Sequence, residues 1–119
     1  MKNHTDKELN EKLAYWKELL GLQDWTIAIS ICRNDDMLLE GVEGETEYCH
    51  QIKTAIIRIL DTVDYGNRIV EQDQEKAIVH ELLHCLFSAI DTDDVILDRL
   101  HHQMIETIAR ALVSAKRDK

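Results

Sequence analysis

The sequence predicts a single α+β domain over residues 1–119, because the chain has the length of one domain and its hydrophobic periodicity changes type along it. A helical repeat opens the chain, strand-like alternation follows, and helical repeats return in the second half. No apolar run approaches the roughly 20 residues that cross a bilayer. The prediction is therefore a helix, then strands, then two helices around one modest core.

The first helix is predicted to begin at residues 5–8, whose sequence TDKE has the pattern of a capping box. Gly21 is predicted to end this helix as its C-cap, since glycine readily adopts the backbone conformation that follows a helix. The apolar stripe between these two points is expected to pack into the core and consists of Leu9, Leu13, Trp16 and Leu20.

Three segments have strand patterns. Residues 25–32 alternate cleanly, and residues 54–60 are apolar on one face, which predicts two strands. Residues 44–52 are weaker and more polar, which suits the edge of a sheet, where charges discourage unwanted pairing. Residues 61–72 are expected to form an irregular connection to the next helix.

The motif H-E-x-x-H at residues 80–84 is the main chemical signal in the chain. Residues four apart lie on the same face of a helix, so His80 and His84 can bind one metal ion. Glu81 projects beside this pair, where its carboxylate can act as general base on a metal-bound water. The segment is apolar nearly all round, which predicts a buried helix that carries a catalytic Zn²⁺ site.

The third metal ligand is expected on the final helix, predicted over residues 94–116, because catalytic zinc sites usually have three protein ligands. Glu106 is the preferred candidate, since it lies among apolar positions that should face the motif helix. His102, one helical turn earlier, is the competing candidate as ligand, as support for a ligand, or as an oxyanion donor. The longer pattern with a third histidine at position 90 is excluded, because Ile90 stands there.

With Glu81 between His80 and His84, and with Glu106 on a second helix, the chain resembles the gluzincin metallopeptidases. Its small size is similar to that of their single-domain members, the minigluzincins. The resemblance implies a zincin-like domain with a small three-stranded mixed sheet, and one Zn²⁺ held by His80, His84 and Glu106. It also implies peptide-bond hydrolysis, although small members of this group can be latent.

The charge and cysteine content limit the partners and the compartment. A formal net charge of −9 argues against non-specific nucleic-acid binding, which needs a basic surface. Three cysteines cannot all pair internally, and the first residues lack the apolar region of a secretory signal, so a reducing cytoplasm is expected. The expected partner is a peptide or protein substrate, with neither nucleic acid nor membrane.

The substrate contacts are predicted from the polar strand, because an edge strand can bind an extended peptide by β-addition. Tyr48 and His50 would share one face of that strand, and with His102 they are candidates to contact the substrate or stabilise an oxyanion. Ordinary strand side chains are the alternative interpretation of Tyr48 and His50. The alternative function for the whole chain is a zinc-bound, non-catalytic interaction or regulatory module.

Overall fold

The computed structural model describes residues 2–90 and 93–118. Helix α1 spans Asp6–Leu19 and begins with the predicted capping box, in which Thr5 accepts from the Glu8 backbone while the Glu8 carboxylate accepts from the Thr5 backbone. Its apolar stripe is buried against the rest of the core through Leu9, Leu13 and Trp16.

The sheet has three strands in the order β1-β3-β2, with β1 at Thr26–Cys32, β2 at Gly44–Cys49 and β3 at Thr54–Leu60. Strands β1 and β3 run parallel, whereas β2 runs antiparallel to β3, so the sheet is mixed. The polar strand β2 lies at an edge, as its composition predicts. The fold is thus α+β, with the expected order of elements.

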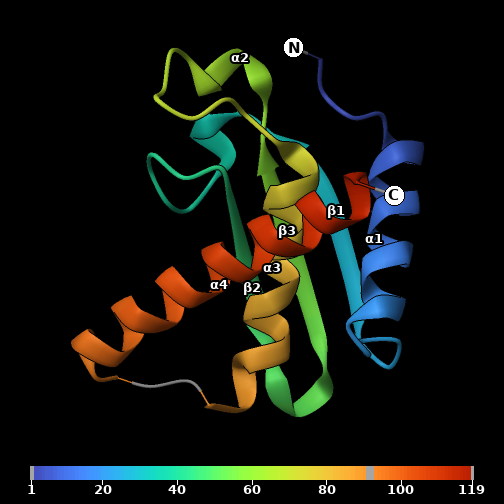
Figure 1. Ribbon diagram of the computed structural model, residues 1–119, viewed down its shortest axis with the longest axis vertical. Coiled ribbons are helices and arrows are strands. Elements are labelled where there is room, and N and C mark those ends of the chain that lie inside the picture. The colour runs from blue at the N-terminus through green and yellow to red at the C-terminus, as the bar shows by residue number, and fades with distance from the viewer. Residues whose placement is uncertain (1, 91–92, 119) are drawn as a thin grey trace.

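The motif helix α3, Gln74–Leu86, lies between the sheet and helix α4, Val95–Arg117 (Figure 1). Ten of the thirteen residues of α3 are buried, which confirms the predicted buried helix. Helix α4 crosses α3 and packs on it through Ile105, Ala109 and Val113, while its first six residues are exposed. This crossing brings side chains of α4 beside the motif.

Two boundaries differ from the sequence prediction. Strand β2 ends at Cys49 instead of continuing to residue 52, because a 3-10 turn at His50–Ile52 follows and Lys53 takes a left-handed conformation with φ of 50°. The connection at residues 61–72 contains a short helix, α2, at Thr62–Tyr65. Within the described residues, no helix combines the length and apolar character that a membrane span requires.

Candidate metal centre

Three histidines meet at the crossing of α3 and α4. One potential ligand atom from each of His80, His84 and His102 lies within 4.8 Å of the others. The rings of His80 and His84 are 5.1 Å apart between centroids, and those of His84 and His102 are 4.8 Å apart. The first two are brought together by their spacing on α3, and the third by packing between helices. Three imidazole donors this close together could form a metal site.

His80 is oriented by a carboxylate. Its Nδ1 lies 2.9 Å from Glu106 Oε1, and because an ionised carboxylate only accepts, Nδ1 donates. The other ring nitrogen, Nε2, then keeps its lone pair for a metal. Burial lowers the pKa of His80 and outweighs the opposing effect of Glu106, which favours the neutral imidazole that metals bind.

Glu106 is the predicted third ligand, and the structure places it beside His80 but outside the group of three ligand atoms. Its Oε2 accepts from Lys76 Nζ at 3.0 Å and from Arg110 Nε at 2.8 Å. Burial raises the Glu106 pKa, but the hydrogen bonds from His80 and Lys76 outweigh it, so the net shift is downward. Direct ligation by Glu106 stays a prediction, whereas its contact with His80 is part of this geometry.

Glu81 points into the same cavity and is buried, with 6% of its surface exposed. Its Oε1 accepts from the Thr46 hydroxyl at 2.7 Å. Burial raises the pKa of Glu81 to about 7, and the Thr46 hydrogen bond opposes this shift only in part. A Cβ at Gly44 would lie 3.3 Å from Glu81 Oε2, so the absence of a side chain there gives the carboxylate room.

His102 is held more loosely than His80. It is exposed on α4, and its Nε2 lies 3.6 Å from Asp98 Oδ2, one turn earlier on the same helix. Both side chains are about half exposed. The structure therefore brings the competing candidate of the sequence prediction, and not only Glu106, to the motif histidines.

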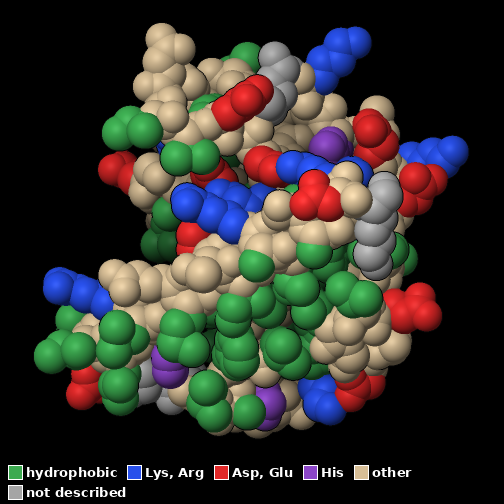
Figure 2. Space-filling view, in the orientation of Figure 1, with side chains coloured by type: hydrophobic (Ala, Val, Ile, Leu, Met, Phe, Trp, Pro, Cys, Tyr) green, Lys and Arg blue, Asp and Glu red, His purple; other side chains and the backbone are tan. Residues whose placement is uncertain are grey.

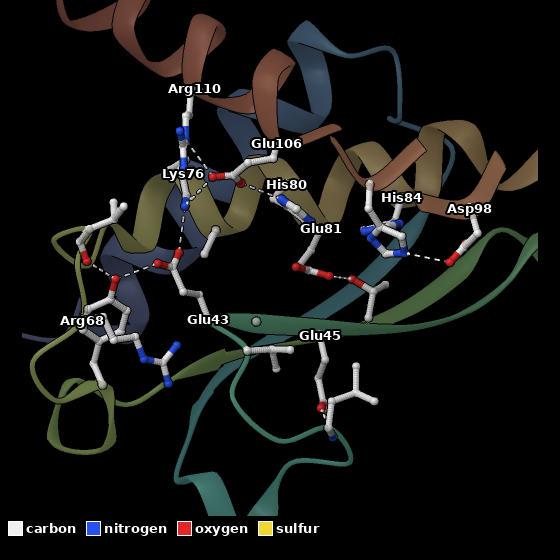
Figure 3. Close-up of a pocket in the computed structure, with 18 of the residues that line it drawn as sticks. Glu43, Glu45, Arg68, Lys76, His80, Glu81, His84, Asp98, Glu106 and Arg110 are labelled. Carbon is white, nitrogen blue, oxygen red and sulfur yellow. Dashed lines mark hydrogen bonds and ion pairs between the residues drawn. The ribbon is translucent and has the colours of Figure 1, made fainter. Parts of the chain in front are cut away.

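A cavity of about 650 Å³ opens over this cluster (Figure 3). It runs from the histidines along β2 to the connection after α2, and Tyr48 is among its lining residues. His50 is not: it lies in the 3-10 turn, and its Nδ1 is 2.7 Å from Ser88 Oγ. Of the two predicted strand contacts, Tyr48 is thus brought to the cavity and His50 is not.

Sequence reasoning missed three polar residues of the site. Lys76 and Glu43 belong to the ion-pair network around Glu106, and Thr46 donates to Glu81. Lys76 could have been found, because it lies four residues before His80 on the same helical face. Glu43 and Thr46 had no such signal, since strand pairing and the contact between α3 and β2 place them there.

Comparisons of the chain with protein-family models, with curated protein sequences and with solved structures found no match.

Proposed function

We propose that this protein is a zinc-dependent peptidase that uses Glu81 as general base. The observation that carries the proposal is the placement of the Glu81 carboxylate in the same cavity as the three clustered histidines. A buried glutamate with a pKa of about 7 is suited to accept and return a proton near neutral pH. A purely structural metal site has no need of such a group.

The metal would be held by His80, His84 and His102, with Glu106 as the hydrogen-bond partner of His80. Bound zinc would polarise the carbonyl of the peptide bond and lower the pKa of a neighbouring water. Histidine ligands usually donate their second ring N–H to a carboxylate or carbonyl, which fixes the ring and raises its basicity. The contact between His80 Nδ1 and Glu106 has this form.

Glu81 would take a proton from the attacking water and return it to the leaving amine. The hydroxyl of Thr46 holds Oε1, which leaves Oε2, near Gly44, for the exchange. The burial of Glu81 excludes bulk water, and the resulting rise in its pKa makes the carboxylate a stronger base than an exposed glutamate.

The cavity suits an extended peptide. Within the described residues, β2 pairs on one side only, with β3. Thr46 and Tyr48 on this strand line the cavity, so a peptide that adds to the outer edge of β2 would pass the histidines. Backbone hydrogen bonds would supply affinity, and the cavity would accept a side chain.

A peptide-library cleavage assay tests the activity, with wild type, chelator-treated wild type and Glu81→Gln compared. We expect cleavage by the wild type, its loss on metal removal and its return with Zn²⁺. Glu81→Gln should reduce turnover by about 10²–10⁴-fold, the usual range for a general base. It should keep about one Zn²⁺ per chain, because Glu81 acts on water and not on the metal. Undiminished cleavage by the variant would exclude this mechanism.

Metal-affinity measurements on His102→Ala and Glu106→Ala decide the third ligand. Loss of a ligand should weaken Zn²⁺ binding by more than the ~10–100-fold that loss of a supporting partner costs. We expect the larger loss in His102→Ala. His101→Ala is the matched control and should bind like the wild type. The opposite order would make Glu106 the ligand, as the sequence prediction has it.

A non-catalytic interaction module is the second candidate, favoured by the exposed apolar surface of α4. Figure 2 shows hydrophobic side chains gathered over α4 and the end of α3. Patches of this kind often mark sites of protein interaction. If the wild type binds zinc but cleaves no library peptide, this second function would replace the first. The exposed side chains on α4 are Val95, Ile96, Leu97, Leu100 and Met104.

A further inference from the structure

Lys76 is a buried lysine next to the candidate metal centre. It has 8% of its surface exposed and lies one helical turn before His80, on the same face of α3. A buried charge is costly unless it is paired, so the partners of Lys76 must offset its desolvation penalty. The sequence motif gives Lys76 no role, and the catalytic scheme does not use it.

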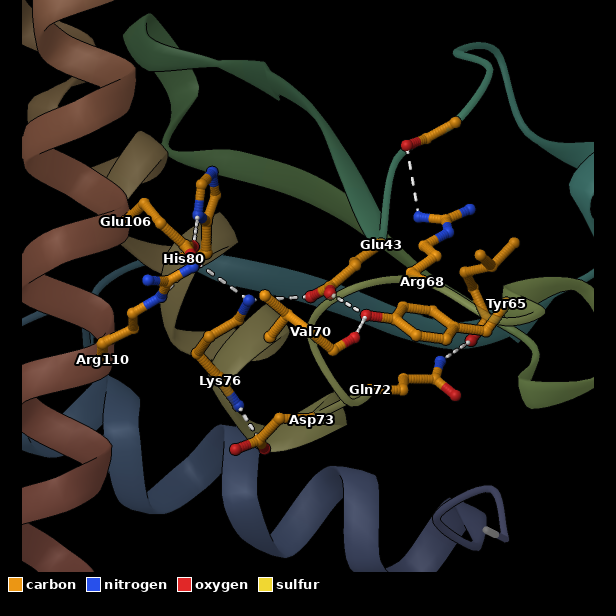
Figure 4. Close-up of polar contacts among 12 residues, drawn as sticks. Glu43, Tyr65, Arg68, Val70, Gln72, Asp73, Lys76, His80, Glu106 and Arg110 are labelled. Atoms are coloured by element: carbon orange, nitrogen blue, oxygen red, sulfur yellow. Dashed lines mark hydrogen bonds and ion pairs between the residues drawn. The ribbon is translucent and has the colours of Figure 1, made fainter.

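Two carboxylates from separate segments of the chain pair with this lysine (Figure 4). Lys76 Nζ lies 2.9 Å from Glu43 Oε2 and 3.0 Å from Glu106 Oε2. Glu43, just before β2, also accepts from the Tyr65 hydroxyl at 2.9 Å. The lysine therefore ties the beginning of β2 to α4, while the other oxygen of Glu106 accepts from His80.

We propose that Lys76 is a positioning residue for the metal centre, which holds Glu106 in place so that Glu106 can orient His80. The inference rests on the proposed metal site. Glu106 has one oxygen on His80 and the other on cations, so its orientation depends on both. Arg110 contacts the same Oε2, but its side chain is 59% exposed, so it constrains Glu106 less than the buried lysine does.

The alternative is that Lys76 only stabilises the fold, and the structure offers a matched control for that role. Glu75, the neighbouring residue on α3, is also buried and pairs with Lys116. Its carboxylate also accepts from Trp16 Nε1 and lies outside the cavity lining. Lys116→Met therefore removes a lysine from a buried glutamate on the same helix without touching the path to His80.

The experiment measures Zn²⁺ affinity by competition with a chromophoric chelator, and the visible absorption of the Co²⁺-loaded protein, in three folded variants. Lys76→Met should weaken Zn²⁺ binding by up to about 10-fold, the lower end of the range for loss of a ligand's direct partner, because Glu106 keeps its contact with His80 but loses its buried support. It should also alter the Co²⁺ spectrum. Lys76→Arg, which keeps the charge, should recover most of the affinity. Lys116→Met should lower the melting temperature but bind both metals like the wild type.

The possible results distinguish failure of the positioning role of Lys76 from failure of the proposed metal site. If the wild type binds no metal, the proposed function fails and the positioning role of Lys76 fails with it. If the wild type binds metal and Lys76→Met binds it equally well with an unchanged Co²⁺ spectrum, the positioning role is overturned and the site stands. Should Lys76→Met not fold, Lys76→Gln takes its place, because its neutral amide removes the charge next to Glu106 but can still hydrogen-bond to Glu43. Weaker binding in that variant than in Lys116→Met supports the proposal, and equal binding overturns it.

Discussion

Two buried glutamates on helix α3 have opposite surroundings. Glu75 lies near Lys116, Lys12 and Arg117 and accepts from the Trp16 indole. Burial raises its pKa, but the hydrogen bonds from Lys116 and Trp16 outweigh it, so the net shift is downward. Glu81, six residues later, accepts from the neutral Thr46 hydroxyl, and burial raises its pKa to about 7.

The difference separates a carboxylate that holds the fold together from one that is suited to chemistry. Cations around Glu75 offset its desolvation and keep it charged, which ties α1 and α4 to the start of α3. Glu81 gains little such compensation, so its charged form is costly. A strongly raised pKa in a cavity beside potential metal ligands marks a functional group more often than a structural one.

The largest expected effect is a pH-dependent gain in stability in metal-free Glu81→Gln. The folded-state pKa of Glu81 is about 7, against an ordinary value of 4.5. Between these values the folded protein keeps a proton that the unfolded chain has lost, so wild-type stability falls as the pH rises through this window. At about 1.4 kcal/mol per pKa unit, the variant should be about 3 kcal/mol more stable than wild type near pH 8.

Urea denaturation with a chelator present, near pH 8 and near pH 5, measures this gain. The advantage of Glu81→Gln should shrink to below about 1 kcal/mol at the lower pH, where the wild-type carboxyl is protonated in the folded state. A gain of equal size at both pH values would mean that the substitution acts through packing and that the Glu81 pKa is not raised.

Glu75→Gln should change the free energy of unfolding in the opposite direction and destabilise the protein by about 2 kcal/mol near neutral pH. Hydrogen bonds to charged groups contribute stability in this range. The pKa of Glu75 is lowered in the folded state, so its contribution is present above the ordinary value and is lost as the pH falls through the folded-state value. Zn²⁺ binding should not change.

The exposed pair of Lys7 and Glu11 supplies the control, since Glu11→Gln should have no measurable effect on the free energy of unfolding. Weakened metal binding in Glu75→Gln would contradict the assignment of a purely structural role to Glu75.

Much of the fold could be predicted because its signals are local. The capping box sets the start of α1, and alternation identifies β1 and β3. The end of β2 could not be predicted, because the left-handed residue that follows its 3-10 turn is Lys53, and no glycine marks it. The parallel pairing of β1 with β3 depends on contacts that no single segment encodes.

The candidate site, like the fold, has a part that local sequence signals predict and a part that depends on packing between segments. The spacing of His80 and His84 on one helix predicts that they share a face, and the structure places them together. The choice between His102 and Glu106 depends on the angle at which α4 crosses α3, and a shift of one turn would exchange them. That angle follows from packing at Ile105, Ala109 and Val113, which helical periodicity alone does not determine.

The smallest effect should come from Thr46→Val, which should increase the difference in pKa between Glu81 and Glu75. Valine keeps the shape of threonine but removes the hydroxyl that donates to Glu81 Oε1 at 2.7 Å. That hydrogen bond lowers the pKa of Glu81 against the effect of burial, so its loss should raise the pKa further. If Glu81 is the general base, the acid side of the pH–rate profile should move upward by the same amount. Turnover should then fall more near pH 6 than near pH 8. Thr54→Val removes a hydroxyl that donates to the Ile52 carbonyl, away from the cavity lining, and should leave the profile unchanged. Identical profiles for wild type and Thr46→Val would show that the titration of another group limits the rate.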